Sequence, residues 1–242
     1  MRYAIFSDVH SNLEALEAVV SACKKESIDK YFCTGDVIGY AASPNKCVEI
    51  VRQLTMIAVA GNHDWAVVNL FSLDSFNSDA RESLLWTQRA LTSESKLFLE
   101  SLTPVYRNNE LTLVHASLNN PREFNYLQDV SSAEESFVLQ DTSVCFLGHT
   151  HIVGIFVSDS EGKVNYSEQA VLNLSQGNKY IVNVGSVGQP RDADPRAAYC
   201  IYDTQKKTIK IKRVAYDVKS ARNRIIEAGL PSALGNRLLT GH

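Results

Sequence analysis

The sequence predicts an α/β protein in which helices cover a parallel sheet and a second, largely antiparallel sheet stacks on the first. Two observations support this prediction. Up to Asp64, an apolar strand, a polar turn and a helix signal recur three times, which is typical of a parallel sheet with helices packed on it. Beyond His151, short strands follow one another with turns between them, which favours hairpins in a second sheet.

The composition is that of a globular protein in one large unit. The chain has 242 residues, of which 45% are hydrophobic and 21% charged, with a formal net charge of -3. These values exclude a disordered, fibrous or membrane-spanning chain. The five cysteines form no C-x-x-C pair, so we expect buried thiols in a reducing compartment. We expect a cytoplasmic location, because a strand begins at Tyr3 without room for a signal peptide and no apolar run could span a membrane.

The charge pattern argues against nucleic acid and membranes as partners. The one basic cluster, over 206–213, alternates with Ile209 and Ile211, which predicts a strand with one solvated face. The mildly acidic chain also lacks a clear basic stripe.

The first elements follow from apolar runs and start signals. An apolar stretch over 3–6 predicts a strand, and Ser11 with Glu14 three residues later predicts a capping box at the start of a helix. A second strand is expected over 31–33. A helix is expected from Ser43-Pro44, because proline is favoured at the first helical position.

A third strand, over 56–60, leads to Gly61-Asn62-His63-Asp64. This polar turn is expected at the carboxyl end of the strand, where ligands bind in open α/β sheets. Residues 65–104 then break the alternation and predict a helical insertion, with helices over 80–91 and 93–102. Four aromatic residues of this region could cover a site but are more typical of core: Trp65, Phe71, Phe76 and Trp86.

The rest of the chain is expected to complete both sheets. Strands over 111–114 and 143–147 resume the first sheet, with a helix from Ser131 between them, where Glu134 completes a capping box. The later elements are strands over 155–158, 180–184, 198–203 and 208–214 and a helix over 218–228.

Five of the six histidines stand just past predicted strands: His10, His63, His115, His149 and His151. Each alone could be an ordinary hydrogen-bonded or exposed histidine. Together with Asp8, Asp36 and Asn62 at matching strand ends, they predict a metal or catalytic site. The pairs Asp8/His10 and His149/His151 are two residues apart, a spacing that directs both side chains to one side of an extended chain.

These residues resemble, in order, the motifs of the calcineurin-like metallophosphoesterase superfamily: Asp8-x-His10, Gly35-Asp36, Gly61-Asn62-His63-Asp64, His115 and Gly148-His149-x-His151. The chain is most similar to the small single-domain prokaryotic phosphoesterases of that superfamily, and the loop over 183–192 resembles one of theirs. The resemblance implies a four-layer α/β/β/α sandwich of two stacked mixed sheets flanked by helices. Residues 1–242 would form one domain, with the helical insertion at about 65–104.

The resemblance also implies two metal ions. One would be held by Asp8, His10, Asp36 and His151, and the other by Asp36, Asn62, His115 and His149. The set supplies nitrogen and oxygen without thiolate, which suits Mn, Fe, Co, Ni or Zn better than Mg. Two divalent ions, two carboxylates and a bridging hydroxide would leave a charge of about +1 to attract a phosphate.

The implied activity is hydrolysis of a phosphate ester, with nucleotide-like substrates among the candidates. A metal-bridging hydroxide would attack phosphodiesters, with phosphomonoesterase activity as a second option. His63 would protonate the leaving group while Asp64 holds its tautomer. Asn62, Asn12, Tyr40 and Arg191 are candidate substrate contacts. Asn12 could instead cap the first helix, Tyr40 could pack, and Arg191 could form a surface pair.

Some positions depart from the protein phosphatases of the superfamily. Gly35-Asp36 continues with Val37-Ile38-Gly39-Tyr40 and not with an arginine loop, and Asp64 stands where those enzymes usually carry Glu. These two differences disfavour a protein phosphatase. Ala116-Ser117-Leu118-Asn119 follows His115, where related small phosphoesterases often have Gly-Ser-Pro-Arg, so a phosphate or base contact of those enzymes is not expected at this position. The alternatives are a non-catalytic protein-binding scaffold on the same fold and, less favoured, a DNA nuclease.

Overall fold

Strand β1 lies inside the first of two six-stranded mixed sheets. The structure, a computed structural model, describes residues 1–55 and 57–242. In spatial order the strands of this sheet are β3 (Ile57–Ala58), β2 (Lys30–Cys33), β1 (Arg2–Phe6), β11 (Ala197–Asp203), β12 (Thr208–Val214) and β9 (Val171–Asn173). β1, β2 and β3 run parallel, whereas β11 pairs antiparallel with β1.

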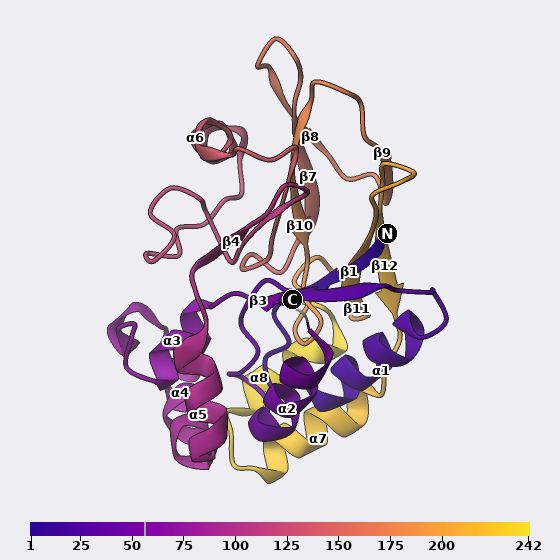
Figure 1. Ribbon diagram of the computed structural model, residues 1–242. Helices are drawn as coiled ribbons and strands as arrows, with labels where there is room; N and C mark the ends of the chain where they lie inside the picture. Colours follow the sequence, from indigo (N-terminus) through magenta and orange to yellow (C-terminus); the bar gives the residue numbers. More distant parts are fainter. Residues whose placement is uncertain (56) are drawn as a thin grey trace.

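The second sheet stacks on the first (Figure 1). Its strands are, in spatial order, β4 (Val105–Arg107), β5 (Thr112–Val114), β6 (Val144–Leu147), β10 (Lys179–Val184), β7 (Val153–Ser158) and β8 (Val164–Ser167). The expectation that 111–114 and 143–147 resume the first sheet is wrong, because β5 pairs with β6 and β6 with β10. The later strands β11 and β12 return to the first sheet. The short strands β4, β8 and β9 lie outside the predicted elements.

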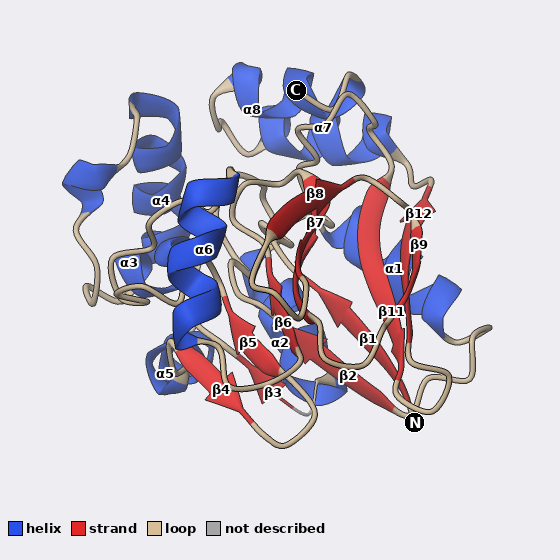
Figure 2. Cartoon of the chain, turned by 90° about the horizontal axis from the view of Figure 1, so that it is seen from above, coloured by secondary structure: helices blue, strands red, loops and turns tan. Residues whose placement is uncertain are grey.

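Helices cover the outer faces of both sheets (Figures 1 and 2). Those on the side of the first sheet are α1 (Leu13–Cys23), α2 (Pro44–Leu54), α7 (Val218–Glu227) and α8 (Ser232–Asn236), the last followed by the 3-10 turn η2 (Arg237–Leu239). α6 (Val130–Leu139) packs on the second sheet. The predicted four-layer α/β/β/α sandwich is thereby confirmed.

The helices between β3 and β4 lie at one end of the sandwich (Figure 1). They are α3 (Asn62–Val67), the 3-10 turn η1 (Leu73–Ser75), α4 (Ser78–Ala90) and α5 (Ser93–Ser101). The bounds of α4 and α5 agree closely with the expected helices over 80–91 and 93–102. β3 is shorter than the strand expected over 56–60, of which residue 56 lies outside the described residues.

Alternating side chains on β1 divide the core into layers, because successive residues of a strand point to opposite faces. Ala4 and Phe6 pack with the helices of the first sheet. Tyr3 and Ile5 pack between the two sheets with residues such as Phe146. A third apolar cluster lies between the second sheet and α6.

Two helices begin differently from the sequence prediction. The cap of α1 is Asn12, whose side-chain oxygen accepts from the Ala15 NH at 3.1 Å, and not Ser11. Asp129 caps α6 with Ser132 in a capping box, so the pair expected there from Ser131 is wrong. Local spacing did not separate neighbouring Ser, Asn and Asp residues that can all act as caps.

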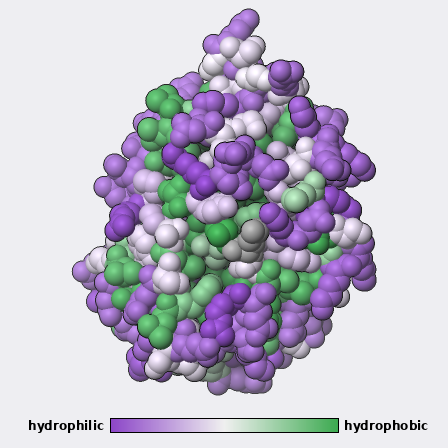
Figure 3. All heavy atoms as spheres, viewed as in Figure 1, coloured by the Kyte–Doolittle hydropathy of each residue, from purple (hydrophilic) through white to green (hydrophobic). Residues whose placement is uncertain are grey.

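The described cysteines are all free and buried, as expected. None of the described helices combines the length and apolar character needed to cross a membrane. Hydrophilic residues cover much of the face in Figure 3, and hydrophobic residues gather across its middle.

Candidate metal centre and substrate cavity

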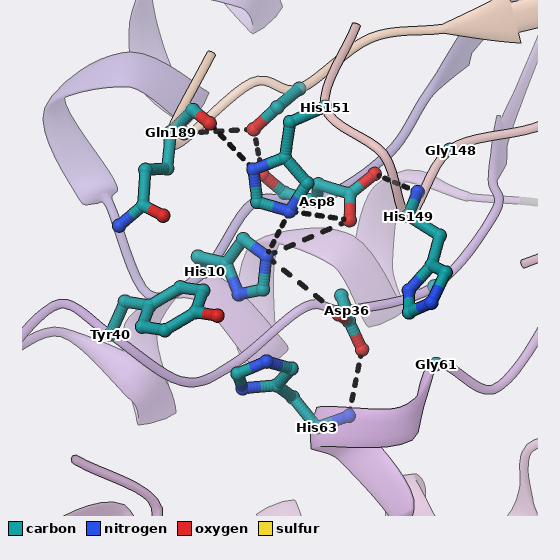
Figure 4. A network of polar contacts seen from close by, with 12 residues as sticks. Asp8, His10, Asp36, Tyr40, Gly61, His63, Gly148, His149, His151 and Gln189 are labelled. Carbon is teal, nitrogen blue, oxygen red and sulfur yellow. Dashed lines mark hydrogen bonds and ion pairs between the residues drawn. The ribbon is translucent and has the colours of Figure 1, made fainter. Parts of the chain in front are cut away.

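Four strands end at one edge of the sandwich, and the polar residues that follow them meet in one cluster (Figure 4). β1 and β2 of the first sheet precede three of these residues, and β5 and β6 of the second sheet precede the other three. All six side chains are at most 6% exposed: Asp8, His10, Asp36, His115, His149 and His151. The structure thus brings together residues that the sequence placed at separate strand ends.

Most of the cluster has an unusual backbone. The φ angles are +53° at Asp8, +49° at His10, +52° at Asp36, +68° at His149 and +63° at His151. Non-glycine residues rarely adopt such angles, and each costs on the order of 1–3 kcal/mol. The side chains therefore converge through left-handed turns past the strands, and the expected presentation by an extended chain is wrong.

The first group combines Asp8, His10 and His151. The Nδ1 atoms of His10 and His151 lie 3.1 Å from the Ile38 carbonyl and 2.6 Å from the Gln189 carbonyl. Because carbonyls only accept hydrogen bonds, both Nδ1 atoms carry a proton. The two Nε2 atoms face each other at 3.0 Å. Oδ1 of Asp8 lies 3.6 Å from the first and 3.2 Å from the second.

The second group combines Asp36, His115 and His149. Nδ1 of His115 donates to the Thr34 carbonyl at 2.8 Å, and its Nε2 faces Nδ1 of His149 at 3.1 Å. Oδ2 of Asp36 lies 3.3 Å from Nε2 of His115 and 3.7 Å from Nε2 of His10. Asp36 therefore lies between the two groups.

Cations fit both groups. In each group, two ring nitrogens about 3 Å apart lie beside a buried carboxylate oxygen, so a cation there would meet nitrogen and oxygen donors together. Buried polar atoms normally have partners, yet Asp8 Oδ1, Asn62 Oδ1 and His149 Nε2 have no hydrogen-bond partner among the described residues. Backbone carbonyls fix the histidine rings, an outer-shell arrangement that metal-binding histidines commonly use. The set supplies only nitrogen and oxygen donors, which suits divalent transition metals.

The carboxylates and histidines also shift one another's protonation. Burial opposes charge on Asp8, but His151 and His10 lower its pKa well below the ordinary value. Burial likewise opposes charge on His115, and Asp36 overcomes it and raises the pKa of His115 to about 9. Burial lowers the pKa of His149 to about 3 and that of His151 to about 4. These two rings are neutral and can act as ligands at neutral pH.

Contrary to the expectation, Asp64 contacts backbone NH groups and not His63. Its Oδ1 accepts from the NH groups of Val37 and Ile38 at 2.8 and 3.2 Å, and its Oδ2 accepts from the Gly61 NH at 3.1 Å. The expectation that Asp64 holds the His63 tautomer is therefore wrong. Asp64 instead ties the loop after β2 to the start of α3, and the expected turn at Gly61 is the cap and first turn of that helix.

Aromatic rings surround His63 in place of a carboxylate. The centroid of its ring lies 4.8 Å from His10, 4.6 Å from Tyr40 and 4.8 Å from Phe76. Its Nδ1 has no hydrogen-bond partner among the described residues. Burial lowers the pKa of His63 well below its ordinary value, although Asp36 opposes this shift.

A cavity of about 300 Å³ opens over the cluster, at the lower end of the range for small-molecule sites. Asp36, Asn62, His63, His149 and His151 line it on the cluster side. Two segments, within 71–80 and 123–126, supply most of the remaining lining, together with Tyr40 and Arg191. Phe71 and Phe76 are half-buried and line the cavity, so the prediction that they are core holds only in part.

Arg191 is held towards the cavity by uncharged groups. Its Nη2 donates to the Tyr40 hydroxyl at 3.2 Å and to Oε1 of Gln189 at 2.9 Å, and its guanidinium lies 5.6 Å from the centroid of the Tyr40 ring. Its Nε is buried and has no partner among the described residues. The neighbouring Asp192 pairs with Arg213, so the surface pair considered for Arg191 does not form there.

Asn12, a candidate substrate contact, does not line this cavity. It is 1% exposed, it caps α1, and its Nδ2 donates to the Gly188 carbonyl at 2.8 Å. Conversely, the sequence did not single out Gln189, Phe124 or Tyr126. Gln189 was named only as a member of the 183–192 loop. Local periodicity does not distinguish an aromatic residue that lines a cavity, such as Phe124, from one that lies in the core.

Comparisons with known proteins agree with this architecture. The model of the calcineurin-like phosphoesterase superfamily domain matches residues 1–207. An uncharacterized protein of Methanocaldococcus jannaschii is 41% identical over 98% of this chain and 97% of its own length. The crystal structure of a metallophosphoesterase from Sphaerobacter thermophilus is 40% identical, with a TM-score of 0.88, over 100% of this chain and 99% of that chain. A hypothetical protein from Pyrococcus horikoshii shares the fold at 19% identity, with a TM-score of 0.81, over 100% of this chain and 98% of that chain.

Proposed function

This chain belongs to the calcineurin-like phosphoesterase superfamily, and we propose that it hydrolyses phosphodiesters with the help of two divalent metal ions held by the buried cluster. As a member of this superfamily it is a metal-dependent phosphoric ester hydrolase. The observation that carries the two-ion proposal is the pair of close contacts between histidine ring nitrogens, 3.0 Å between His10 and His151 and 3.1 Å between His115 and His149. Each contact lies beside a buried carboxylate.

This geometry supports the two proposed ligand sets. Asp36 belongs to both, because its Oδ2 faces His10 in one group and His115 in the other. The first set is Asp8, His10, Asp36 and His151, and the second is Asp36, Asn62, His115 and His149. Two bound transition-metal ions would supply Lewis acidity and an activated water for in-line attack on phosphorus.

His63 is the proposed proton donor to the departing oxygen. It lines the cavity but belongs to neither ligand set. The aromatic rings around it fix its position, while burial keeps its pKa low. A bound phosphate places negative charge beside the ring and raises that pKa, because an opposite charge favours the protonated form. The substrate thus brings His63 towards the state in which it can donate.

Arg191 and Tyr40 are the proposed contacts for the phosphate oxygens, together with Asn62, which also belongs to the second ligand set. A guanidinium beside an anion forms stronger hydrogen bonds than a neutral donor does. Arg191 meets only uncharged partners among the described residues, so it gains an anionic partner when substrate binds.

The first experiment compares bis(p-nitrophenyl) phosphate with p-nitrophenyl phosphate. Chelated protein is reloaded separately with Mn, Fe, Co, Ni, Zn and Mg, and p-nitrophenol release and metal content are measured. We expect metal-dependent hydrolysis that favours the diester. Asp36→Asn should abolish hydrolysis and lower the metal content, whereas Asp141→Asn, at an exposed ion pair with Arg107, should change neither. Two bound metals without hydrolysis of any ester would favour a binding scaffold.

A further inference from the structure

We propose that the cavity binds a nucleobase on the leaving-group side of the phosphate, so that the natural substrate is a small nucleoside phosphodiester that releases its nucleoside. This inference rests on the phosphodiesterase function proposed above and adds the substrate class. The base would occupy an aromatic subsite, defined here as Phe71, Phe76, Asn77, Phe124 and Asn125, all of which line the cavity.

Three phenylalanine rings meet in the subsite, of which Phe71 and Phe76 are partly exposed and Phe124 is buried. Phe71 packs edge to face with Phe76 at a centroid distance of 6.0 Å and with Phe124 at 5.2 Å. Phe71 and Phe76 are only half-buried, although rings of this size usually bury their faces. Bases of single-stranded nucleic acids stack on aromatic side chains, and each stacked base contributes about 1–3 kcal/mol. A flat ring could therefore stack on the exposed part of Phe71 or Phe76.

Two asparagine amides add a hydrogen-bonding edge to the subsite. Asn77 uses its carbonyl oxygen to cap α4, accepting from the Ala80 NH at 3.0 Å. Asn125 uses its NH₂ group on Glu123 at 3.0 Å. Among the described residues, this leaves the NH₂ of Asn77 as a donor and the carbonyl oxygen of Asn125 as an acceptor. A nucleobase edge offers the complementary pair, whereas a phenyl group would use neither amide.

The place of the subsite fixes the orientation of the substrate. Phe76 packs on the His63 ring at a centroid distance of 4.8 Å. A base that stacks on Phe76 would therefore belong to the leaving group, whose ester oxygen His63 protonates. In the reaction, water oxygen forms a bond to phosphorus, and the bond between phosphorus and the nucleoside 5′-oxygen breaks. The proton of His63 goes to that oxygen, and a proton from the water replaces it. The products are a nucleoside and the phosphomonoester of the second alcohol.

Binding is measured first, with metal-loaded protein and two phosphonates in which carbon replaces the ester oxygen. One is the analogue of AMP and the other that of ribose 5-phosphate, so the pair differs only in the base. Calorimetry should show the AMP analogue binding about 5- to 100-fold more tightly, the range measured for stacking of one base. Equal affinities would overturn the subsite.

Variants then locate the preference. Phe71→Leu and Phe76→Leu should each bring the affinity ratio towards one. The matched control is Phe98→Leu on α5, because Phe98 is also half-buried but does not line the cavity. Circular dichroism spectra identical to those of the unaltered protein show that each variant is folded. A ratio lowered equally by the control would overturn the assignment of the subsite.

Product analysis tests the orientation. The methyl ester of AMP should yield adenosine and methyl phosphate, and kcat/KM should exceed that of the ribose 5-phosphate methyl ester. AMP and methanol as products would overturn the orientation. Tighter binding of the adenosine analogue without hydrolysis of any ester would support the subsite but refute the proposed phosphodiesterase. Hydrolysis of bis(p-nitrophenyl) phosphate together with equal affinities for the two analogues would support the phosphodiesterase but refute the subsite.

Discussion

At the scale of single residues, His63 lies close to the proposed ligands His10 and Asp36 but is also packed among aromatic rings. The rings of Tyr40 and Phe76 hold it in place. We expect His63→Ala to keep both metals and to lose about 10²- to 10⁴-fold in kcat on an ester with a poor leaving group. The loss should be much smaller on bis(p-nitrophenyl) phosphate, whose leaving group needs little protonation. Metal analysis and steady-state kinetics measure both. Full activity on the poor leaving group would exclude His63 as the proton donor.

Arg191 offers a second test at this scale. Arg191→Gln removes the charge near the cavity and should lower kcat/KM about 10- to 100-fold, because hydrogen bonds to a charged group contribute about 1.5–3 kcal/mol. Arg196→Gln is the matched control, since Arg196 pairs with Asp194 at the surface. If both variants kept the kcat/KM of the unaltered enzyme, Arg191 would not contact the substrate.

The expectation for Asp64 failed at the residue scale for a physical reason. A sequence shows that a carboxylate follows a histidine, but not which backbone NH groups will surround it. Here Val37 and Ile38, far along the chain, supply those groups. The histidines and aspartates of the cluster could be predicted because each follows a strand. Their left-handed backbone angles could not, because they depend on the packing of both sheets.

At the scale of elements, α1 is anchored through its cap. Asn12→Ala should lower the free energy of unfolding by about 1–2 kcal/mol, since it removes the cap and the hydrogen bond to Gly188. Ser11→Ala should have a smaller effect, because the Ser11 hydroxyl has no partner among the described residues. Urea unfolding measures both. Since Asn12 does not line the cavity, kcat/KM of the folded variant should stay unchanged, and a large drop would restore it as a substrate contact.

The positions of helices and strands along the chain were predicted better than the pairing of the strands. Strand and helix positions follow from local periodicity, so β1, β2 and β6 lie close to where the sequence put them. Sheet membership depends on which edges meet in space, and β5 and β6 joined β10 instead of the first sheet. The division into one domain with an insertion over 65–104 stays a prediction.

At the scale of the whole molecule, the buried histidines should make the stability of metal-free protein depend on pH in two directions. His115 has a pKa of about 9 in the folded chain, above the ordinary value of 6.5, so its contribution is full below pH 6.5 and is lost as pH rises towards 9. His149 and His151 have pKa values of about 3 and 4, so stability also falls as pH drops from 6.5 towards 4. Carboxylates with depressed pKa values, such as Asp8, add to the loss at the acidic end.

Urea unfolding of chelated protein at pH 5, 6.5 and 8.5 should therefore give the highest free energy of unfolding near pH 6.5. His115→Asn should flatten the alkaline side only. A stability that rose steadily up to pH 9 would contradict the raised pKa of His115. Adding metal should raise the melting temperature most on the alkaline side, because the ligand histidines must lose their protons before they bind.

The cluster draws Asp8 and Asp36 from the loops after one sheet and His115 and His149 from the loops after the other. Ions held there would have ligands from both halves of the sandwich and would therefore cross-link the two sheets. The two sheets could then separate only if the ions lost the ligands of at least one sheet. Loaded protein should consequently unfold far more slowly than its equilibrium stability suggests, and its lifetime would be set by how fast metal leaves.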